Sequence, residues 1–281
     1  MTKNTDLHSH SNYSDGSSSP EELIKLAKKR KIKNIALTDH NSVKGIKKAM
    51  IEGKKIGVNV IPAVEIRAND AEILGYFIDF KNKNLIDTLS KISQRIENSV
   101  EEWCKKLNKA GYNITFKEIK EKFYKSEGIN EFHVLYSLNF KKYGTITKLY
   151  KKLKNQKLTP NKIKEITVIQ AINLIKKAGG VPVLAHPWLG DTNKNFKRMK
   201  SFVKAGLKGI EINNGDTAPL KKKSMNKKIK TIAKKYNLVL TSGSDYHGEK
   251  IIKIMVGNHN LGKNNCDEKI VDKLKGLSQS S

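Results

Sequence analysis

The chain begins with two histidines and two aspartates within its first fifteen positions. In the segment Asp6-Leu7-His8-Ser9-His10, the two-residue period of a strand would place both histidines on the same face. Asp15-Gly16 then predicts a turn that can bring a carboxylate back over that face. Imidazole and carboxylate together form a ligand set for Zn, Mn or Fe. Taken alone, the segment would also fit a polar, poorly ordered N-terminus.

The same types of side chain recur where several apolar segments end. The segments 35–37, 60–64, 181–184 and 238–240 are rich in β-forming residues. The ionisable residues that follow them are Asp39, His40, Glu65, His186, Asp245 and His247. Ionisable groups at the carboxyl ends of several buried strands are typical of a βα-barrel active site. One histidine after a strand would more often be structural, but the convergence of several strand ends favours a site.

The elements that would position these residues alternate along most of the chain, which predicts the α/β fold class. Strands are expected at 5–9, 34–37, 58–66, 73–78, 181–185, 209–212 and 239–242. Helices are expected from Ser19, over 43–56, from Thr167, over 196–205, over 221–236 and over 268–277. Ser19 with Glu22, and Thr167 with Gln170, have the spacing of a capping box at a helix start.

A central region has no strand pattern. From 85 to about 165 the apolar spacing favours helices, at 85–109, 116–123 and 132–140. We therefore expect a barrel formed by residues 1–82 and 166–281, with residues 83–165 as a helical insertion that covers its mouth. The lysine-rich second half of the insertion carries Tyr143 and Tyr150, so it could contact a nucleic acid backbone and stack bases. An exposed helical face with tyrosines in the core is the more ordinary interpretation of each residue.

The combined pattern resembles the PHP (polymerase and histidinol phosphatase) family of metal-dependent phosphoesterases. The resemblance rests on the segments 6–16, 37–41, 64–65, 185–187 and 242–247, and it extends from Thr5 to about Gly248. It implies a distorted seven-stranded βα barrel with a helical insertion. Within the family, the chain is most similar to the group that cleaves nucleoside 3′,5′-bisphosphates and short RNA or DNA.

The resemblance also implies a cluster of two or three divalent ions, held through nine positions of the family. Eight of these positions are matched here, by His8, His10, Asp15, His40, Glu65, His186, Asp245 and His247. Glu65 would bridge the first two ions, and His8, His10 and Asp245 would complete the first site. His186 would help to hold the second ion, and Asp15, His40 and His247 would hold the third. A shared carboxylate is reasonable between two ions that lie about 3.5–4 Å apart.

Glu72 departs from the family pattern at the ninth position, where relatives usually have a histidine before this strand. A glutamate can still bind a metal through a harder oxygen, which favours Mn, Mg or Fe over Zn at the second site. Alternatively, Glu72 is a solvated edge residue and the second site is weaker or empty. We expect ligation, because Glu72 is the only candidate in register.

The segment Ile129-Asn130-Glu131-Phe132-His133 of the insertion departs from the family as well. Relatives often have, at position 131, an arginine that helps to bind phosphate, and a glutamate there would repel it. His133 matches a family histidine near the substrate phosphate, which implies a phosphate contact or a proton donor. A histidine on a helix surface is the alternative interpretation.

The implied reaction is hydrolysis of a phosphomonoester or phosphodiester, in which a hydroxide that bridges two ions attacks phosphorus. Glu65, Asp245, His247 and His133 are the residues that the resemblance places in catalysis. Nucleotides and short oligonucleotides are the expected substrates, and Mn, Fe, Zn or Mg the expected ions. The alternatives are a phosphatase for small molecules such as histidinol phosphate, and a nucleic-acid-binding protein with an inactive site.

The composition is compatible with these expectations. The chain has 281 residues, with 55 Lys and Arg against 27 Asp and Glu, and its net charge of +28 would attract anionic substrates. Most of this charge is expected on solvated helix faces. No apolar run is long enough to span a bilayer, and the N-terminus has no signal-peptide pattern. With only Cys104 and Cys266 as thiols, we expect a cytoplasmic protein.

Overall fold

The computed structural model describes residues 3–138, 145–161, 163, 165–189, 192–213, 219–252 and 259–278. Tyr143, one of the two tyrosines noted in the lysine-rich part of the insertion, lies outside these residues, as does the end of the helix expected over 132–140. In the part of the chain that is described, no helix is both long enough and apolar enough to cross a membrane.

Eight strands form one sheet in the order β7-β6-β5-β4-β3-β2-β1-β8. They are β1 (Lys3–Asp6), β2 (Asn34–Leu37), β3 (Asn59–Ala68), β4 (Ala71–Tyr76), β5 (Val181–Leu184), β6 (Gly209–Asn213), β7 (Val239–Ser242) and β8 (Cys266–Asp267). β4 is antiparallel to β3 and β5, and β8 is antiparallel to β1, whereas the other pairs are parallel. Leu7 N donates to Ser242 O (3.2 Å), and this bond nearly closes the sheet into a barrel.

The predicted α/β barrel is confirmed, with one difference in the number of strands. β1 to β7 correspond to the seven expected strands, although the first was expected at 5–9 and is Lys3–Asp6. β8 is additional. It has only two residues and is defined by its pairing with β1, where Thr5 is opposite Cys266, so no alternation of apolar residues announces it.

Alternate residues of the strands build a compact apolar layer on one side of the sheet. This layer includes Ile61, Ala63, Leu74, Tyr76, Val181 and Val183. Because neighbouring residues of a strand point to opposite faces, Glu65 and Arg67 continue the row that the layer occupies on β3. Glu72 continues the corresponding row on β4. The fold therefore places these three charged side chains at the end of the apolar layer.

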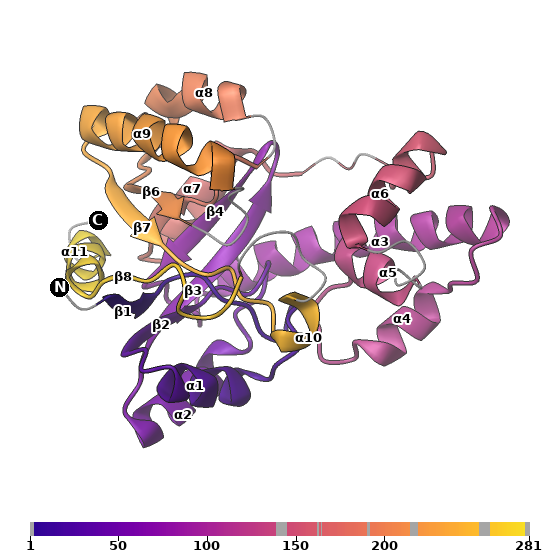
Figure 1. Ribbon diagram of the computed structural model, residues 1–281, viewed down its shortest axis with the longest axis horizontal. Coiled ribbons are helices and arrows are strands. Elements are labelled where there is room, and N and C mark those ends of the chain that lie inside the picture. Colours follow the sequence, from indigo (N-terminus) through magenta and orange to yellow (C-terminus); the bar gives the residue numbers. More distant parts are fainter. Residues whose placement is uncertain are drawn as a thin grey trace.

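Seven helices in the described residues lie before β4 or after residue 167 in the chain. They are α1 (Pro20–Lys29), α2 (Ile46–Ile56), α7 (Val168–Lys177), α8 (Thr192–Ala205), α9 (Pro219–Tyr236), α10 (Glu249–Ile252) and α11 (Lys269–Ser278). Figure 1 shows α8 and α9 at the top, α1 and α2 at the bottom, and α11 beside the two termini. The capping boxes predicted at Ser19 and Thr167 are confirmed. α2 ends at Gly57, whose φ of 73° favours glycine.

Four further helices follow one another between β4 and α7. They are α3 (Lys83–Lys109), α4 (Phe116–Lys122), α5 (Glu131–Ser137) and α6 (Ile146–Asn155), and they gather on one side of the barrel, away from α8 and α9 (Figure 1). Trp103 Nε1 donates to Leu158 O (2.7 Å), which ties the segment after α6 to α3. α6 was not expected as a separate helix, because Leu149 and Leu153 are its only fully buried residues.

Candidate metal centre

Backbone contacts draw the loops after β1 and β7 together. Asp245 N donates to His8 O (2.9 Å), and His10 N donates to Tyr246 O (2.8 Å). Gly243 permits this approach, because a Cβ atom there would lie 2.4 Å from the backbone nitrogen of His8. Asp245 has a φ of 54°, a conformation that aspartate tolerates better than most residues. The local backbone thus brings the side chains of both loops to one place.

The first group of side chains consists of His8, His10, Glu65 and Asp245. Glu65 Oε2 lies 3.1 Å from His8 Nε2 and 3.4 Å from His10 Nε2. Asp245 Oδ1 lies 3.3 Å from His8 Nε2 and 3.1 Å from His10 Nε2. All four residues are buried. This is the set of residues that the sequence predicts for the first ion.

A second group of side chains, His186, Glu72 and His40, lies beside Glu65. Glu65 Oε1 lies 2.9 Å from His186 Nε2, which is also 3.4 Å from Glu72 Oε2. Glu72 Oε1 lies 3.7 Å from His40 Nδ1, and a parallel backbone bridge joins His40 to Glu65. Glu65 Oε1 therefore faces His186, whereas Oε2 faces His8, His10 and also His40 Nδ1 (3.3 Å), so its two oxygens contact different imidazoles, as a bridging carboxylate requires. Glu72 lies among the other predicted ligands.

The third group consists of Asp15, His40 and His247, with His10 beside them. His247 Nε2 lies 3.3 Å from Asp15 Oδ1, and His40 Nε2 lies 3.8 Å from Asp15 Oδ2. The rings of His10 and His247 stack with their centroids 4.1 Å apart. The structure thus brings together the three residues that the sequence assigns to a third ion, and it places His10 between this group and the first.

Burial and mutual charge displace the pKa values of the carboxyl groups in the cluster. Burial alone would raise the pKa of Glu65, but the charges of His8 and His40 hold it well below its ordinary value. The pKa of Glu72 is raised, by burial and by the negative charge of Glu65. Without a metal, Glu72 is therefore costly to ionise, and a divalent cation nearby would reverse that cost.

His10 shows that the cluster fits a cation. It is fully buried, and although Nε2 lies 3.1 Å from Asp245 Oδ1, neither ring nitrogen forms a well-aligned hydrogen bond with a described residue. Burial, together with the charges of His247 and His40, lowers the pKa of His10 to about 3, so its ring is neutral. A buried polar group without a partner is unfavourable. A neutral imidazole nitrogen beside carboxylates is in the form that binds a metal ion, so the residues present fit the divalent ions that the sequence implies.

Glu211 supports the cluster, although the sequence identified it only as part of a strand. Its buried carboxylate, at β6, accepts hydrogen bonds from His8 Nδ1 (3.1 Å) and from His186 N (2.8 Å). A proton on His8 Nδ1 leaves Nε2 to face Glu65 and Asp245. Glu211 thus orients the ring of one predicted ligand and the backbone of another. A charged residue within the apolar segment 209–212 is the signal that could have revealed it.

We expect Glu211→Gln to weaken metal binding by about 10- to 100-fold while the protein stays folded. Glutamine keeps the size of the side chain, but it can turn an amide donor toward His8 Nδ1 and so disturb the preferred tautomer. Calorimetric titration of the metal-free protein with Mn²⁺ measures the effect, and thermal unfolding reports the fold. Glu52→Gln is the control, because Glu52 is a mostly buried carboxylate on α2. Parent-like affinity in Glu211→Gln would contradict a positioning role.

Two buried aspartates hold the loops that carry the predicted ligands. Asp39 accepts hydrogen bonds from Ser11 N (2.7 Å), Ser11 Oγ (2.7 Å) and Ser14 Oγ (2.8 Å), which fixes the loop after β1. Asp6 accepts a hydrogen bond from Ser244 N (2.9 Å) in the loop after β7. Burial raises the pKa of both carboxyl groups, and these hydrogen bonds oppose the rise. The segment 6–10 and the segment 39–40 therefore each supply a structural carboxylate as well as predicted metal ligands.

His133 lies beside the cluster and is fully buried, so the interpretation as a helix-surface histidine is wrong. Its Nε2 donates to Ser14 O (3.1 Å), and its Nδ1 accepts from Asn130 N (3.0 Å). Burial lowers the pKa of His133. Asn130 Nδ2 donates to Asp15 Oδ2 (2.8 Å). With both ring nitrogens on backbone atoms, His133 joins α5 to the loop after β1, and these contacts do not support the predicted phosphate contact.

Glu131 is paired with a cation that the sequence did not associate with it. Arg67 Nη1 lies 2.7 Å from Glu131 Oε2, and Arg67 Nη2 lies 3.0 Å from Glu131 Oε1. The Nε group of the same arginine pairs with Glu165. The guanidinium therefore weakens the repulsion of phosphate that Glu131 alone would cause.

Named relatives are similar over most of both chains. A phosphoribosyl 1,2-cyclic phosphate 1,2-diphosphodiesterase from Eggerthella lenta is 30% identical over 255 residues, which are 87% of this chain and 94% of the relative. A 5′-3′ exoribonuclease from Haemophilus influenzae is 30% identical over 88% of this chain and 91% of its own. A 3′,5′-nucleoside bisphosphate phosphatase from Chromobacterium violaceum is 28% identical over 87% of each chain.

Solved structures share the fold. A protein described as a metal-dependent phosphoesterase from Bifidobacterium adolescentis superimposes with a TM-score of 0.82 and 22% identity, over 97% of this chain and 96% of its own. A Chromobacterium violaceum protein described as an amidohydrolase superimposes with a TM-score of 0.80 and 24% identity, over 98% and 96% of the two chains. At these identities the likeness shows the fold alone. The sequence profile of the PHP domain matches residues 6–181, more than half of the chain, and the protein therefore belongs to the PHP family.

Proposed function

We propose that the protein hydrolyses phosphate esters of nucleotides or short oligonucleotides at the metal centre described above. The observation that carries this proposal is the convergence of all nine predicted ligands, from separate segments of the chain, on one mostly buried cluster. The names of the three relatives all concern phosphate esters, of a phosphoribosyl compound, of RNA and of a nucleoside bisphosphate. The family and the donor set together support a hydrolase of phosphoric esters.

The centre is proposed to hold two or three divalent ions. We assign the first to His8, His10, Glu65 and Asp245, the second to Glu65, Glu72 and His186, and the third to Asp15, His40 and His247. When bound, the ions supply positive charge to the phosphate and lower the pKa of a water molecule toward neutrality. Two carboxylates at the second site favour Mn, Mg or Fe there over Zn. The role of the protein is to hold these ligands in place. Glu211 and Asp39 contribute to this through their hydrogen bonds to His8 and to Ser11.

Residues 83–165 are proposed to form a lid that selects the substrate. Three contacts support this proposal. Asn130 Nδ2 donates to Asp15 Oδ2 (2.8 Å), Glu127 N donates to Tyr13 O (3.0 Å), and Glu131 pairs with Arg67. The insertion therefore touches the loop after β1 and the end of β3, both of which carry predicted ligands. A substrate at the centre would lie against residues of the insertion.

The test of the proposed function is a screen of the Mn²⁺-loaded protein against defined phosphate esters. The set contains a nucleoside 3′,5′-bisphosphate, a short RNA, a phosphoribosyl cyclic phosphate and histidinol phosphate. Release of phosphate or of nucleotides from the first two is expected. Exclusive turnover of histidinol phosphate or of the phosphoribosyl cyclic phosphate would replace the proposed substrate class, and no turnover of any ester would contradict the function.

The purified protein should bind two or three divalent ions per chain, and loading should release protons. Burial alone would lower the pKa of His186 and of His247, but neighbouring carboxylates raise both values to about 10 in the metal-free protein. Each ring is therefore a positively charged imidazolium near pH 7 and must lose one proton to bind a metal. The affinity for the metal should consequently rise from about pH 6 to 9. Elemental analysis and calorimetry in buffers of different ionisation enthalpy measure both effects. Fewer than one ion per chain after loading, or affinity independent of pH, would contradict the assignment.

A further inference from the structure

Two neighbouring cavities, which together we call the passage, border the metal centre at one end and α6 at the other. One cavity of about 250 Å³ is bordered by the predicted ligands Glu72 and His186 and by Arg67 and Asp70. A second cavity, of about 500 Å³, shares Arg67 and Asp70 with the first and reaches Tyr150 of α6. Because Arg67 and Asp70 border both cavities, a group attached to a phosphate at the metal centre would lie in the first cavity and point toward the second.

The charges along the passage are largely paired. Arg67 binds Glu131 through both terminal nitrogens and Glu165 through Nε. Asp70 Oδ2 lies 3.6 Å from Arg198 Nη1. These side chains leave no excess of positive charge for a second phosphate. The passage therefore suits the uncharged base and sugar of a nucleotide better than a further phosphate group.

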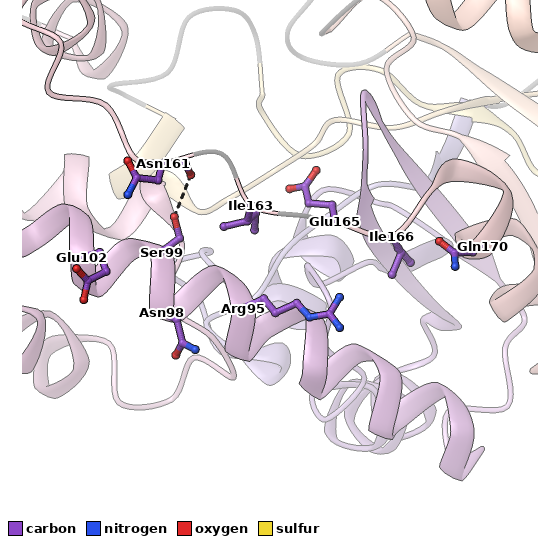
Figure 2. A pocket seen from close by; sticks show the side chains of 9 residues that line it. All are labelled: Arg95, Asn98, Ser99, Glu102, Asn161, Ile163, Glu165, Ile166 and Gln170. Carbon is purple, nitrogen blue, oxygen red and sulfur yellow. Dashed lines mark hydrogen bonds between the residues drawn. The ribbon is translucent and has the colours of Figure 1, made fainter.

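Asn161 and Tyr150 supply uncharged polar groups to the second cavity. Asn161 is held in place by α3, because Ser99 Oγ donates to its backbone oxygen (3.1 Å). Figure 2 shows this hydrogen bond, with Asn161 and Glu165 on the segment that returns to the barrel and Arg95 on α3. The cavity of about 800 Å³ drawn there is bordered by α3, and its lining includes no predicted metal ligand. Of these three cavities, the one of about 250 Å³ is the one bordered by predicted metal ligands.

α6 presents a basic and aromatic face at the rim of the second cavity. Tyr150 is 39% exposed, and Lys151 and Lys154 are exposed as well. Tyr150 and Lys154 lie one helical turn apart, with Lys151 beside them. The helix contains no acidic residue. Neither lysine forms an ion pair with any residue that the structure describes. We call Tyr150, Lys151 and Lys154 the α6 face.

We propose that the α6 face binds a single-stranded nucleic acid whose phosphate ester lies at the metal centre. This proposal rests on the function proposed above and extends it to a polymeric substrate. A base in the second cavity can stack on Tyr150, and such stacking is tolerant of sequence because every base has an aromatic face. The backbone phosphates outside the passage then lie against Lys151 and Lys154. A duplex does not fit this arrangement, since a base must leave its partner to enter the cavity.

The test compares the binding of a fluorescent, hydrolysis-resistant single strand of about eight nucleotides by the parent protein and three variants. Lys151→Gln/Lys154→Gln removes the charge of the α6 face, and Tyr150→Leu removes its ring. Lys148→Gln/Lys152→Gln removes the same charge from the other side of the same helix and serves as the matched control. Glutamine and leucine are good helix formers, so α6 is retained, which circular dichroism checks.

We expect the Lys151→Gln/Lys154→Gln variant to bind about tenfold more weakly. The slope of log K against log salt concentration should become less steep by about 1.4, because each phosphate contact on a single strand contributes about 0.7 to this slope. Tyr150→Leu should also lose about tenfold in affinity. The control should bind like the parent. Equal losses in the two lysine pairs, or parent-like binding by Tyr150→Leu, would overturn the proposal. Turnover of a mononucleotide by the parent is measured in parallel, so a failure of the proposed function stays separate from a failure of the α6 face.

Discussion

Glu65→Gln is expected to abolish turnover. Glutamine fills the same space, but it removes the negative charge that faces His8 and His10 on one side and His186 on the other. Several kcal/mol of charge stabilisation at the phosphate would be lost, which corresponds to a decrease in kcat of more than about 1000-fold. A loss in kcat rather than a change in KM would show that the charge matters in the transition state. Steady-state kinetics of the metal-loaded variant measures kcat and KM, and elemental analysis measures its metal content.

Glu52→Gln is the control for the loss of a buried carboxylate as such. Glu52 lies on α2, where it forms an ion pair with Lys25 (3.9 Å), and it is not among the predicted metal ligands. This variant should keep the kcat of the parent. Near-normal kcat in Glu65→Gln, together with an unchanged metal content, would contradict the assignment of Glu65 as a bridging ligand.

The location of the cluster could be predicted because it depends on local patterns that the sequence carries. His186 follows β5 within two residues, and Asp245 follows β7 within three. Strand ends of a βα barrel converge whatever the details of packing, so an ionisable residue at each end implies a common site. The seven longer strands were visible for the same reason. Their apolar character does not depend on the partner against which each strand packs.

The remaining features arise from contacts between distant segments, which no local period encodes. Glu211 reaches His8 across 203 positions, and Arg67 reaches Glu131 across 64. His133 Nε2 reaches the carbonyl group of Ser14 across 119 positions. α6 has two fully buried leucines among its lysines, so its periodicity is weak. In each case the sequence shows the residue type, whereas only the fold shows its partner.

Glu72→Ala is expected to lose one bound ion and most of the activity. The carboxylate lies 3.4 Å from His186 Nε2 and 3.7 Å from His40 Nδ1. Its removal leaves the second site with only the imidazole of His186 and one oxygen of Glu65, which are fewer ligands than a stable site needs. Hydrolysis should fall by about 100-fold or more, because the charge of the second ion is worth several kcal/mol. Metal stoichiometry and kcat of the parent and the variant provide the measurement.

Glu72→His separates a ligand from an edge residue. If Glu72 binds the second ion, an imidazole in its place should retain the ion and raise the affinity for Zn²⁺ relative to Mn²⁺, because imidazole is a softer ligand than carboxylate. The raised pKa of Glu72 points the same way, since burial and Glu65 disfavour its charge until a cation is present. If Glu72 is instead a solvated edge residue, both variants should keep the metal stoichiometry, the metal preference and the kcat of the parent. Competition of Zn²⁺ against Mn²⁺ in the three proteins therefore decides whether the second ion depends on Glu72 or is held by Glu65 and His186 without it.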